Sequence, residues 1–364
     1  MKKIGIVTFH TALNYGAVMQ TYALQNFLSD LGYDSEVINY RCPFTEKCYS
    51  PFFVSDGKYI NALVRGVFFG RIIKNKKRKF ETFLRNYVNL SKAYYETSEM
   101  EKDRENYSYF VSGSDQVWSP ISAGFDDFYF LPFAKDNQKL SYAASIGSTK
   151  LGVDTKDEIY SRLSGFSVLS VREESAKQLL RDANQDRKIL VHPDPTLLLQ
   201  KDKWLEIASK TEIEGRYVLL FNVEKPINDV EFAKRIAIER NIKIVYINDR
   251  TIKKEEDITY IEAPSPNEFL GLFANAEVVV TNSFHGAVFS IIFQKEFYVE
   301  LDNRKQRNIR VEGLLSQLEI PSRDISMEVI STRINWQNVE KILDDKRNIV
   351  TDYFSTYIKS DSTK

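Results

Sequence analysis

The stretch VVVTNSFHGAV at residues 278–288 decides the predicted fold. It begins with three β-branched apolar residues, which are typical of a buried strand in a parallel sheet. Three short polar residues then break the apolar run, and a second apolar segment at 287–293 is typical of a helix packed on that strand. His285 is therefore expected where the carboxyl end of a strand turns into a helix N-terminus.

That position has two interpretations. Ligands of open α/β sheets bind beyond the carboxyl ends of the strands. A helix N-terminus also attracts anions, and a histidine there adds a group that can carry a proton near neutral pH. The stretch thus indicates an anion or phosphate site with an acid/base, or else a histidine that only caps the turn by hydrogen bonds.

Composition narrows the class of protein. A chain of 364 residues favours about two domains. The chain is 43% hydrophobic and 27% charged, and 50 basic residues balance 50 acidic ones, so no overall field favours nucleic acid. No apolar run approaches the ~20 residues of a membrane span. The chain enters a strand at once, without an apolar signal segment, and we expect a cytoplasmic protein.

The cysteines and histidines indicate no metal site. Cys42 and Cys48 are the two cysteines, and their spacing, with no histidine near it, is not that of a zinc site. We expect them to be reduced thiols. The three histidines are His10, His192 and His285, too few for a catalytic metal site built from histidine.

The N-terminal segment predicts a βαβ unit. An apolar strand at 4–9 is followed by a turn that ends in Asn14, Tyr15 and Gly16, then by an amphipathic helix and a second strand at 36–40. Such strands are parallel, with a right-handed connection. The turn lacks G-x-G-x-x-G, which disfavours NAD and FAD.

Residues 60–88 have a helical pattern, with a predicted interruption between Gly66 and Gly70. The apolar residues between these glycines are followed by a run of cations at 74–79. Basic residues beside exposed aromatics can dock on an anionic membrane surface. The alternative, which we favour at this stage, is a solvated helix face.

Two charged residues follow predicted strands of the first half. Asp115 comes after the strand at 107–111 and can act as a base or cap the next segment, the cap being the simpler interpretation. Arg172 comes after the strand at 167–171 and just before a helix. It can grip a carboxylate or phosphate, or pair with Glu173 or Glu174.

A second set of strands and helices follows residue 200. We predict an α/β fold of two Rossmann-type domains, 1–200 and 201–330, with parallel sheets facing a central cleft, and a C-terminal helix within 331–364 that crosses back to the first domain. The first domain would contribute Arg172 and the loop at 14–16. The second would contribute His285 and Lys305.

Six segments together resemble the polysaccharide pyruvyl transferase family. They occur in the family's order over nearly the whole chain: FHTALNYGAVMQTYALQ at 9–25, SGSDQVW at 112–118, SYAASIG at 141–147, SVREES at 170–175, HPDPT at 192–196 and TNSFHGAVF at 281–289. Each segment alone is weak evidence, but the ordered set is specific.

The resemblance implies a GT-B-like pair of Rossmann domains. It also implies transfer of pyruvate from phosphoenolpyruvate to a sugar, often a galactose-type hexose, as a ketal with release of phosphate. The acceptor would belong to a cell-surface polysaccharide or its lipid-linked precursor. Phosphoenolpyruvate would be a co-substrate, with no cofactor, and the protein would be cytoplasmic or peripheral at the inner face of the membrane.

Site residues follow from the same resemblance. It places Arg172 against phosphoenolpyruvate, Lys305 on a basic loop near it, and a histidine at His285. The reaction also needs a general acid, a role that suits His285 at a helix N-terminus, and a base for the acceptor hydroxyls, which Asp115 or Asp194 can provide. The remaining predicted substrate-binding residues are Ser283, Phe284, Gly286, Asn14, Tyr15 and Gly16.

One departure concerns Ser283, where the family pattern has an arginine. Arg304, Arg307 or Arg310 can supply the missing charge, or the donor differs. Two alternatives therefore stay open: a GT-B glycosyltransferase that uses a nucleotide sugar, and a non-catalytic sugar- or anion-binding module. The acceptor and the oligomeric state are not predicted.

Overall fold

The computed structural model describes residues 3–50, 52–53, 59–122, 125–181, 187–223, 225–248, 254–301, 308–327 and 333–359, with the backbone alone for 59–65 and 308. The chain divides into two compact units. The first comprises Met1–Tyr49, Leu84–Leu199 and Leu343–Lys364, and the second Ser50–Phe83 and Gln200–Ile342. The domain limits at residues 200 and 330 remain a prediction.

The first unit is built on a parallel sheet in the order β3-β2-β1-β4-β5. Its strands are β1 (Lys3–Val7), β2 (Ser35–Tyr40), β3 (Leu90–Tyr94), β4 (Tyr107–Ser112) and β5 (Lys139–Ser141). A parallel pair, β6 (Leu169–Val171) and β7 (Ile189–Val191), lies beside it. Single bridges from Asp115 to Ala144 and from Ala144 to Val171 connect the pair to the sheet.

The second unit repeats this topology. Its parallel sheet has the order β10-β9-β8-β11-β12. The strands are β8 (Tyr217–Phe221), β9 (Lys243–Ile247), β10 (Ile258–Ile261), β11 (Val278–Thr281) and β12 (Glu296–Val299). Both sheets therefore have the doubly wound order 3-2-1-4-5, in which the strand order reverses beside the first strand. The predicted α/β fold with two parallel Rossmann-type sheets is confirmed.

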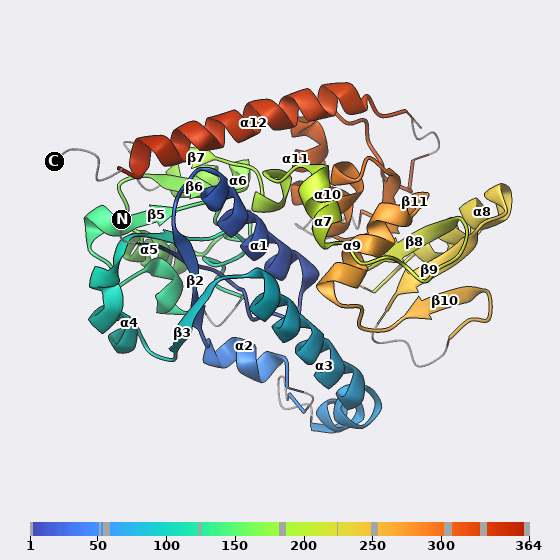
Figure 1. The fold of residues 1–364 in the computed structure, drawn as a ribbon, viewed down its shortest axis with the longest axis horizontal. Helices are drawn as coiled ribbons and strands as arrows, with labels where there is room; N and C mark the ends of the chain where they lie inside the picture. The colour runs from blue at the N-terminus through green and yellow to red at the C-terminus, as the bar shows by residue number, and fades with distance from the viewer. Residues whose placement is uncertain are drawn as a thin grey trace. The chain divides into compact units, whose positions relative to one another are not determined.

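Helices cover the sheets of each unit (Figure 1). In the first unit these are α1 (Tyr15–Asp30), α2 (Pro43–Cys48), α4 (Thr97–Asp103), α5 (Val153–Arg162) and α6 (Glu174–Arg181). In the second they are α7 (Lys201–Ile207), α8 (Asp229–Arg240), α9 (Pro266–Asn275), α10 (Phe284–Ile292) and α11 (Asn308–Gln317). No helix of the described ranges is long and apolar enough to cross a membrane.

Helix α3 (Tyr59–Tyr87) corrects one prediction, because it runs without a break through Gly66 and Gly70. Glycine weakens a helix through backbone entropy, but tertiary contacts outweigh that cost. A Cβ on Gly66 would lie 2.0 Å from Cε1 of Phe52, so the ring occupies the space that a side chain would need. Gly70 is buried.

Helix α12 (Trp336–Tyr357) packs within the first unit from Leu343 onward. The hydroxyl of Tyr353 donates to the carbonyl of Ser141, with 2.7 Å between the oxygens. Phe354 is fully buried, with its ring centroid 6.3 Å from that of Phe27 and 5.3 Å from that of Tyr142. These contacts attach the C-terminal helix to α1 and to the segment after β5.

We expect Phe354→Ala to lower the free energy of unfolding of the first unit by about 3–5 kcal/mol, because a buried aromatic side chain leaves a cavity. Ile349→Ala on the same helix removes a side chain that is exposed, and we expect a change within about 0.5 kcal/mol. Urea unfolding followed by circular dichroism measures both. Equal effects of the two variants would contradict the packing described for α12.

Candidate functional site

The turn from β11 into α10 is held by side-chain hydrogen bonds. Ser283 is the N-cap of α10, and its hydroxyl accepts from the backbone N–H of Gly286 at 3.3 Å. The hydroxyl of Thr281 accepts from the N–H of Ser283 at 3.0 Å and donates to the carbonyl of Phe221 at 2.5 Å. A serine can cap a helix in this way, whereas an arginine cannot.

Gly286 is required by the close approach of α10 to the end of β11. A Cβ at this position would lie 2.2 Å from Oγ1 of Thr281, which is buried and already bonded on both sides. Any larger residue would push the helix away from the strand. The N-terminal turn of α10 is thereby fixed to the carboxyl edge of the sheet, as the sequence predicted.

His285 stands in that first turn and is partly exposed. Its ring packs edge-on against Phe284, with 5.1 Å between the centroids. The guanidinium of Arg310, on α11, lies 5.8 Å from the centroid of Phe284. The structure therefore brings a cation, an aromatic ring and a histidine together at the N-terminus of a helix, where the backbone adds positive partial charge.

The other two histidines differ from His285. His10 and His192 are buried, and burial lowers the pKa of both. The pKa of His192 falls to about 4, first through burial and then through the charge of Lys346. Both rings are therefore neutral at pH 7, whereas His285 is partly exposed, with Nε2 of its ring buried.

Asparagines link the ends of β8 and β11. The side-chain oxygen of Asn222 accepts from the N–H of Asn282 at 3.1 Å, and that of Asn282 accepts from the N–H of Val223 at 3.0 Å. Glu300, just beyond β12, accepts from the N–H groups of Ile227 and Asn228. Polar side chains therefore follow β8, β11 and β12 at the carboxyl edge of this sheet.

Asp229, the first residue of α8, lies at the same edge and is fully buried. Neither of its carboxylate oxygens is in hydrogen-bonding geometry with a described residue. Burial, and next the charge of Glu300, raise the pKa of Asp229 to about 7. Asp229 therefore holds a proton more readily than an ordinary aspartate does.

Arg172 is the centre of an ion-pair cluster in the first unit. Its side chain is 3% exposed, and it donates to Asp194 at 2.8 Å and to Glu173 at 3.0 Å. Oδ1 of Asp115 lies 4.0 Å away. Burial alone would lower the pKa of Arg172, but the three carboxylates raise it above its ordinary value. The guanidinium is charged, and its partners already include a buried carboxylate from the segment after β7.

Asp115 and the loop at 14–16 make local contacts. Asp115 adopts φ 73°, and its side chain, 17% exposed, accepts from the N–H of Gln116 at 2.9 Å. Asn14 is the N-cap of α1 and accepts from the N–H of Gly16 at 2.9 Å. Tyr15 and Gly16 are buried. These residues shape turns at the carboxyl ends of β4 and β1, and their contact with a substrate stays a prediction.

The structure thus brings the predicted residues together in two groups. Arg172 and Asp115 lie in the first unit, and Ser283, Phe284, His285 and Gly286 in the second. Lys305 lies outside the described residues, as do Arg304 and Arg307. Throughout the described ranges, no group of three or more His, Cys, Asp and Glu side chains could hold a metal ion.

Sequence reasoning missed several residues of the edge. Asn222 and Glu300 each follow a strand immediately, at the position where ligand-binding residues of parallel sheets occur. Asp229 begins a helix and carried no such signal, because an aspartate there is ordinarily a solvated residue of the first turn. Only its burial distinguishes it.

The comparison with protein families matches residues 14–299 to the polysaccharide pyruvyl transferase model. The chain belongs to the polysaccharide pyruvyl transferase family. The match covers β11, the Ser283 cap and His285, together with Arg172 and Asp115. As a member of this family the protein is a transferase of polysaccharide biosynthesis. The comparison with curated proteins returned no match.

Solved structures agree on the fold of this pyruvyl transferase family member. A UDP-N-acetylglucosamine 2-epimerase is similar with a TM-score of 0.54 and 13% identity, over 100% of this chain and 99% of that one. A Listeria monocytogenes protein provisionally given the same name has a TM-score of 0.52 and 13% identity, over 96% and 91%. The S. aureus MnaA–UDP structure has a TM-score of 0.50 and 14% identity, over 98% of this chain and 91% of that one. At these identities the likeness shows the GT-B fold alone.

Asp229→Asn is expected to stabilise the protein at neutral pH. With its pKa raised, the folded state of the wild type holds a proton that the unfolded chain releases between about pH 4 and 7, so the free energy of unfolding falls as pH rises through this range. An amide does not titrate, so the Asp229→Asn variant lacks this pH dependence. Its free energy of unfolding should exceed that of the wild type by on the order of 2–4 kcal/mol above pH 7 and differ little from it below pH 4. Urea unfolding at several pH values measures the difference.

The matched control is Asp257→Asn, which neutralises an exposed aspartate of the same unit. We expect its unfolding free energy to follow the wild type at every pH. If Asp229→Asn also followed the wild type at every pH, the pKa of Asp229 would not be raised by folding, and Asp229 would be ionised in the folded protein at neutral pH.

Arg172→Ala is expected to lower the free energy of unfolding by about 3–5 kcal/mol, because it leaves the buried carboxylate of Asp194 without its counter-charge. Adding Asp194→Asn should restore part of the loss. Arg181→Ala, at the exposed end of α6, is the control and should stay within about 0.5 kcal/mol. If Arg172→Ala were as stable as this control, the ion pair with Asp194 would not contribute to the stability of the fold.

Proposed function

We propose that the protein transfers the pyruvyl group of phosphoenolpyruvate to two hydroxyls of a saccharide, forming a ketal and releasing phosphate. Membership of the family supports the reaction type. The observation that carries the proposal further is the position of His285 in the first turn of α10, next to Phe284 and Arg310.

The chemistry requires a proton at the methylene carbon of the donor. Its delivery turns the methylene into a methyl group and leaves an oxocarbenium-like centre at the adjacent carbon. The first saccharide hydroxyl attacks this carbon and releases its proton. The second hydroxyl forms the other C–O bond as the bond to phosphate breaks, and its proton leaves with the phosphate. One side chain that can both donate and accept a proton can serve these transfers, and we assign this role to His285.

Donor binding requires positive charge for a phosphate and a carboxylate. The N-terminus of α10 offers backbone N–H groups, and Arg310 offers a guanidinium. We propose that Arg310 supplies the charge that Ser283 lacks. The roles of Arg172, Lys305 and Asp115, and a central cleft in which they would meet His285, remain parts of the proposal. We further propose that the reaction takes place in the cytoplasm, where phosphoenolpyruvate is produced, on a cell-surface saccharide or its lipid-linked precursor.

Thermal shift with phosphoenolpyruvate tests the donor. A ligand at about 100 times its dissociation constant stabilises the native state by about 2.7 kcal/mol, so the melting midpoint should rise by several degrees. UDP-N-acetylglucosamine and inorganic phosphate serve as comparisons. A larger shift with the nucleotide sugar would favour a glycosyltransferase. No shift with phosphoenolpyruvate or with the nucleotide sugar would speak against both the pyruvyl transferase and the glycosyltransferase.

Arg310→Gln should remove most of the shift caused by phosphoenolpyruvate. Arg235→Gln is its matched control, because Arg235 also lies over a phenylalanine of the second unit, 5.2 Å from the centroid of Phe232. His285→Gln should keep the shift but slow phosphate release with a methyl galactoside acceptor by about 10²–10⁴-fold. Undiminished release by His285→Gln would remove this histidine from the mechanism.

A further inference from the structure

The exposed face of α3 combines two kinds of side chain. Val67 and Phe68 are exposed near the start of its described side chains, at 69% and 59%. Arg71, Lys74 and Arg78 follow at spacings of three and four residues, which place them on one face of a helix, and all three are exposed. The face is therefore apolar at one end and cationic along the next two turns.

The apolar end has a third member. Phe52 is 58% exposed, and its ring lies against α3 at Gly66, where a Cβ would be 2.0 Å from Cε1 of the ring. A glycine is needed at this position for the ring to rest on the helix. Exposed apolar side chains gathered in one place mark an interaction surface, because they would otherwise be buried in the core.

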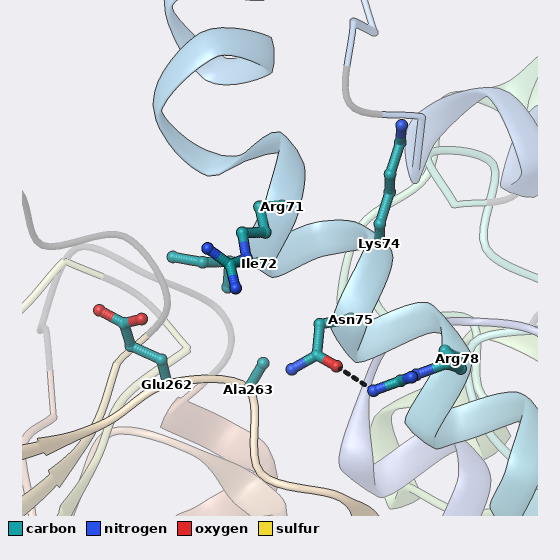
Figure 2. Close-up of a pocket in the computed structure, with 7 residues that line it drawn as sticks. All are labelled: Arg71, Ile72, Lys74, Asn75, Arg78, Glu262 and Ala263. Atoms are coloured by element: carbon teal, nitrogen blue, oxygen red, sulfur yellow. Dashed lines mark hydrogen bonds between the residues drawn. The ribbon is translucent and has the colours of Figure 1, made fainter.

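The cationic part of the face lines a pocket of about 600 Å³. Figure 2 shows the guanidinium of Arg71 and the amide of Asn75 reaching toward Glu262, whereas Lys74 extends away from them. Arg78 donates to the side-chain oxygen of Asn75 at 2.9 Å, which leaves the amide NH₂ of Asn75 as a donor.

The pocket has a net positive charge. Its carboxylate, Glu262, is paired with Lys254 at 2.6 Å. In the part of the chain that the structure describes, no carboxylate lies within 4.0 Å of a charged nitrogen of Arg71, Lys74 or Arg78. The guanidinium groups of Arg71 and Arg78, with no acidic partner among the described residues, suit a phosphate group together with the amide donor of Asn75.

The opposite side of α3 is used for packing. Phe80 and Phe83 are buried, and Lys79 pairs with Glu268 of α9 at 2.8 Å. The helix is thus anchored to its own unit, while the face from Val67 to Arg78 stays outward.

We propose that α3 docks the protein on an anionic lipid surface, with Phe52, Val67 and Phe68 entering the boundary between headgroups and acyl chains. The pocket beside them holds the phosphate of a lipid headgroup through Arg71, Asn75 and Arg78. An apolar edge continuous with cations matches this boundary. Nucleic acid fits less well, because the 50 acidic residues balance the 50 basic ones and the cations are confined to one short face.

Co-sedimentation with phosphatidylcholine vesicles, with and without phosphatidylglycerol, tests the proposal in the absence of phosphoenolpyruvate. We expect binding to the anionic vesicles that weakens as salt is added. The triple variant Arg71→Gln, Lys74→Gln, Arg78→Gln should bind roughly a hundredfold more weakly, since each cation near such a surface contributes about fivefold. The failure of this experiment would leave the proposed reaction untouched.

The matched control changes three exposed lysines of the same unit, Lys201→Gln, Lys210→Gln and Lys243→Gln, and should bind as the wild type does. An equal loss in this control would overturn the proposal, as would equal binding to vesicles without phosphatidylglycerol. Binding to duplex DNA but not to vesicles would assign the face to nucleic acid instead. Displacement from vesicles by glycerol phosphate at low concentration would assign the pocket to a soluble phosphate.

The apolar end has a separate readout. Phe68→Ser should weaken vesicle binding by roughly tenfold or more, because an inserted aromatic side chain is lost. Phe68→Trp should bind as the wild type does and shift its emission to shorter wavelength when anionic vesicles are added. A tryptophan whose emission stays unchanged in vesicle-bound protein would exclude insertion of this end of α3.

Discussion

The candidate site of the second unit depends on the hydroxyl of Thr281. It is buried at the end of β11, donates to β8 through the carbonyl of Phe221, and accepts from the N–H of Ser283. It also occupies the space where any side chain at position 286 would lie. One hydroxyl thus joins two strands, sets the start of α10 and requires a glycine after His285. The histidine is presented at the carboxyl edge because these contacts allow the turn no other path.

The two units treat buried charge in opposite ways. In the first, Arg172 sits among three carboxylates, so its charge is compensated and its geometry is fixed. In the second, Asp229 is buried near Glu300, and no cation among the described residues is paired with it, so its pKa rises instead. A compensated arginine holds segments together, whereas an uncompensated acid can hold a proton near pH 7.

Much of the fold could be predicted because parallel sheets have strong local signals. Buried strands such as β8, β9 and β11 are short apolar runs, and the Asn14 and Ser283 caps mark where helices begin. The predicted break in α3 was wrong because a local glycine rule ignores the Phe52 ring that rests on Gly66.

The sequence by itself determined the class of fold, the family and the place of His285, because strand runs, caps and ordered motifs are properties of neighbouring residues. The tertiary structure alone decided which partners each charge has. Arg310 and Phe284 are 26 positions apart in the sequence, Arg172 and Asp194 are 22 apart, and Asp229 and Glu300 are 71 apart. Coulomb interactions and desolvation depend on distance and burial in space, which no local pattern records.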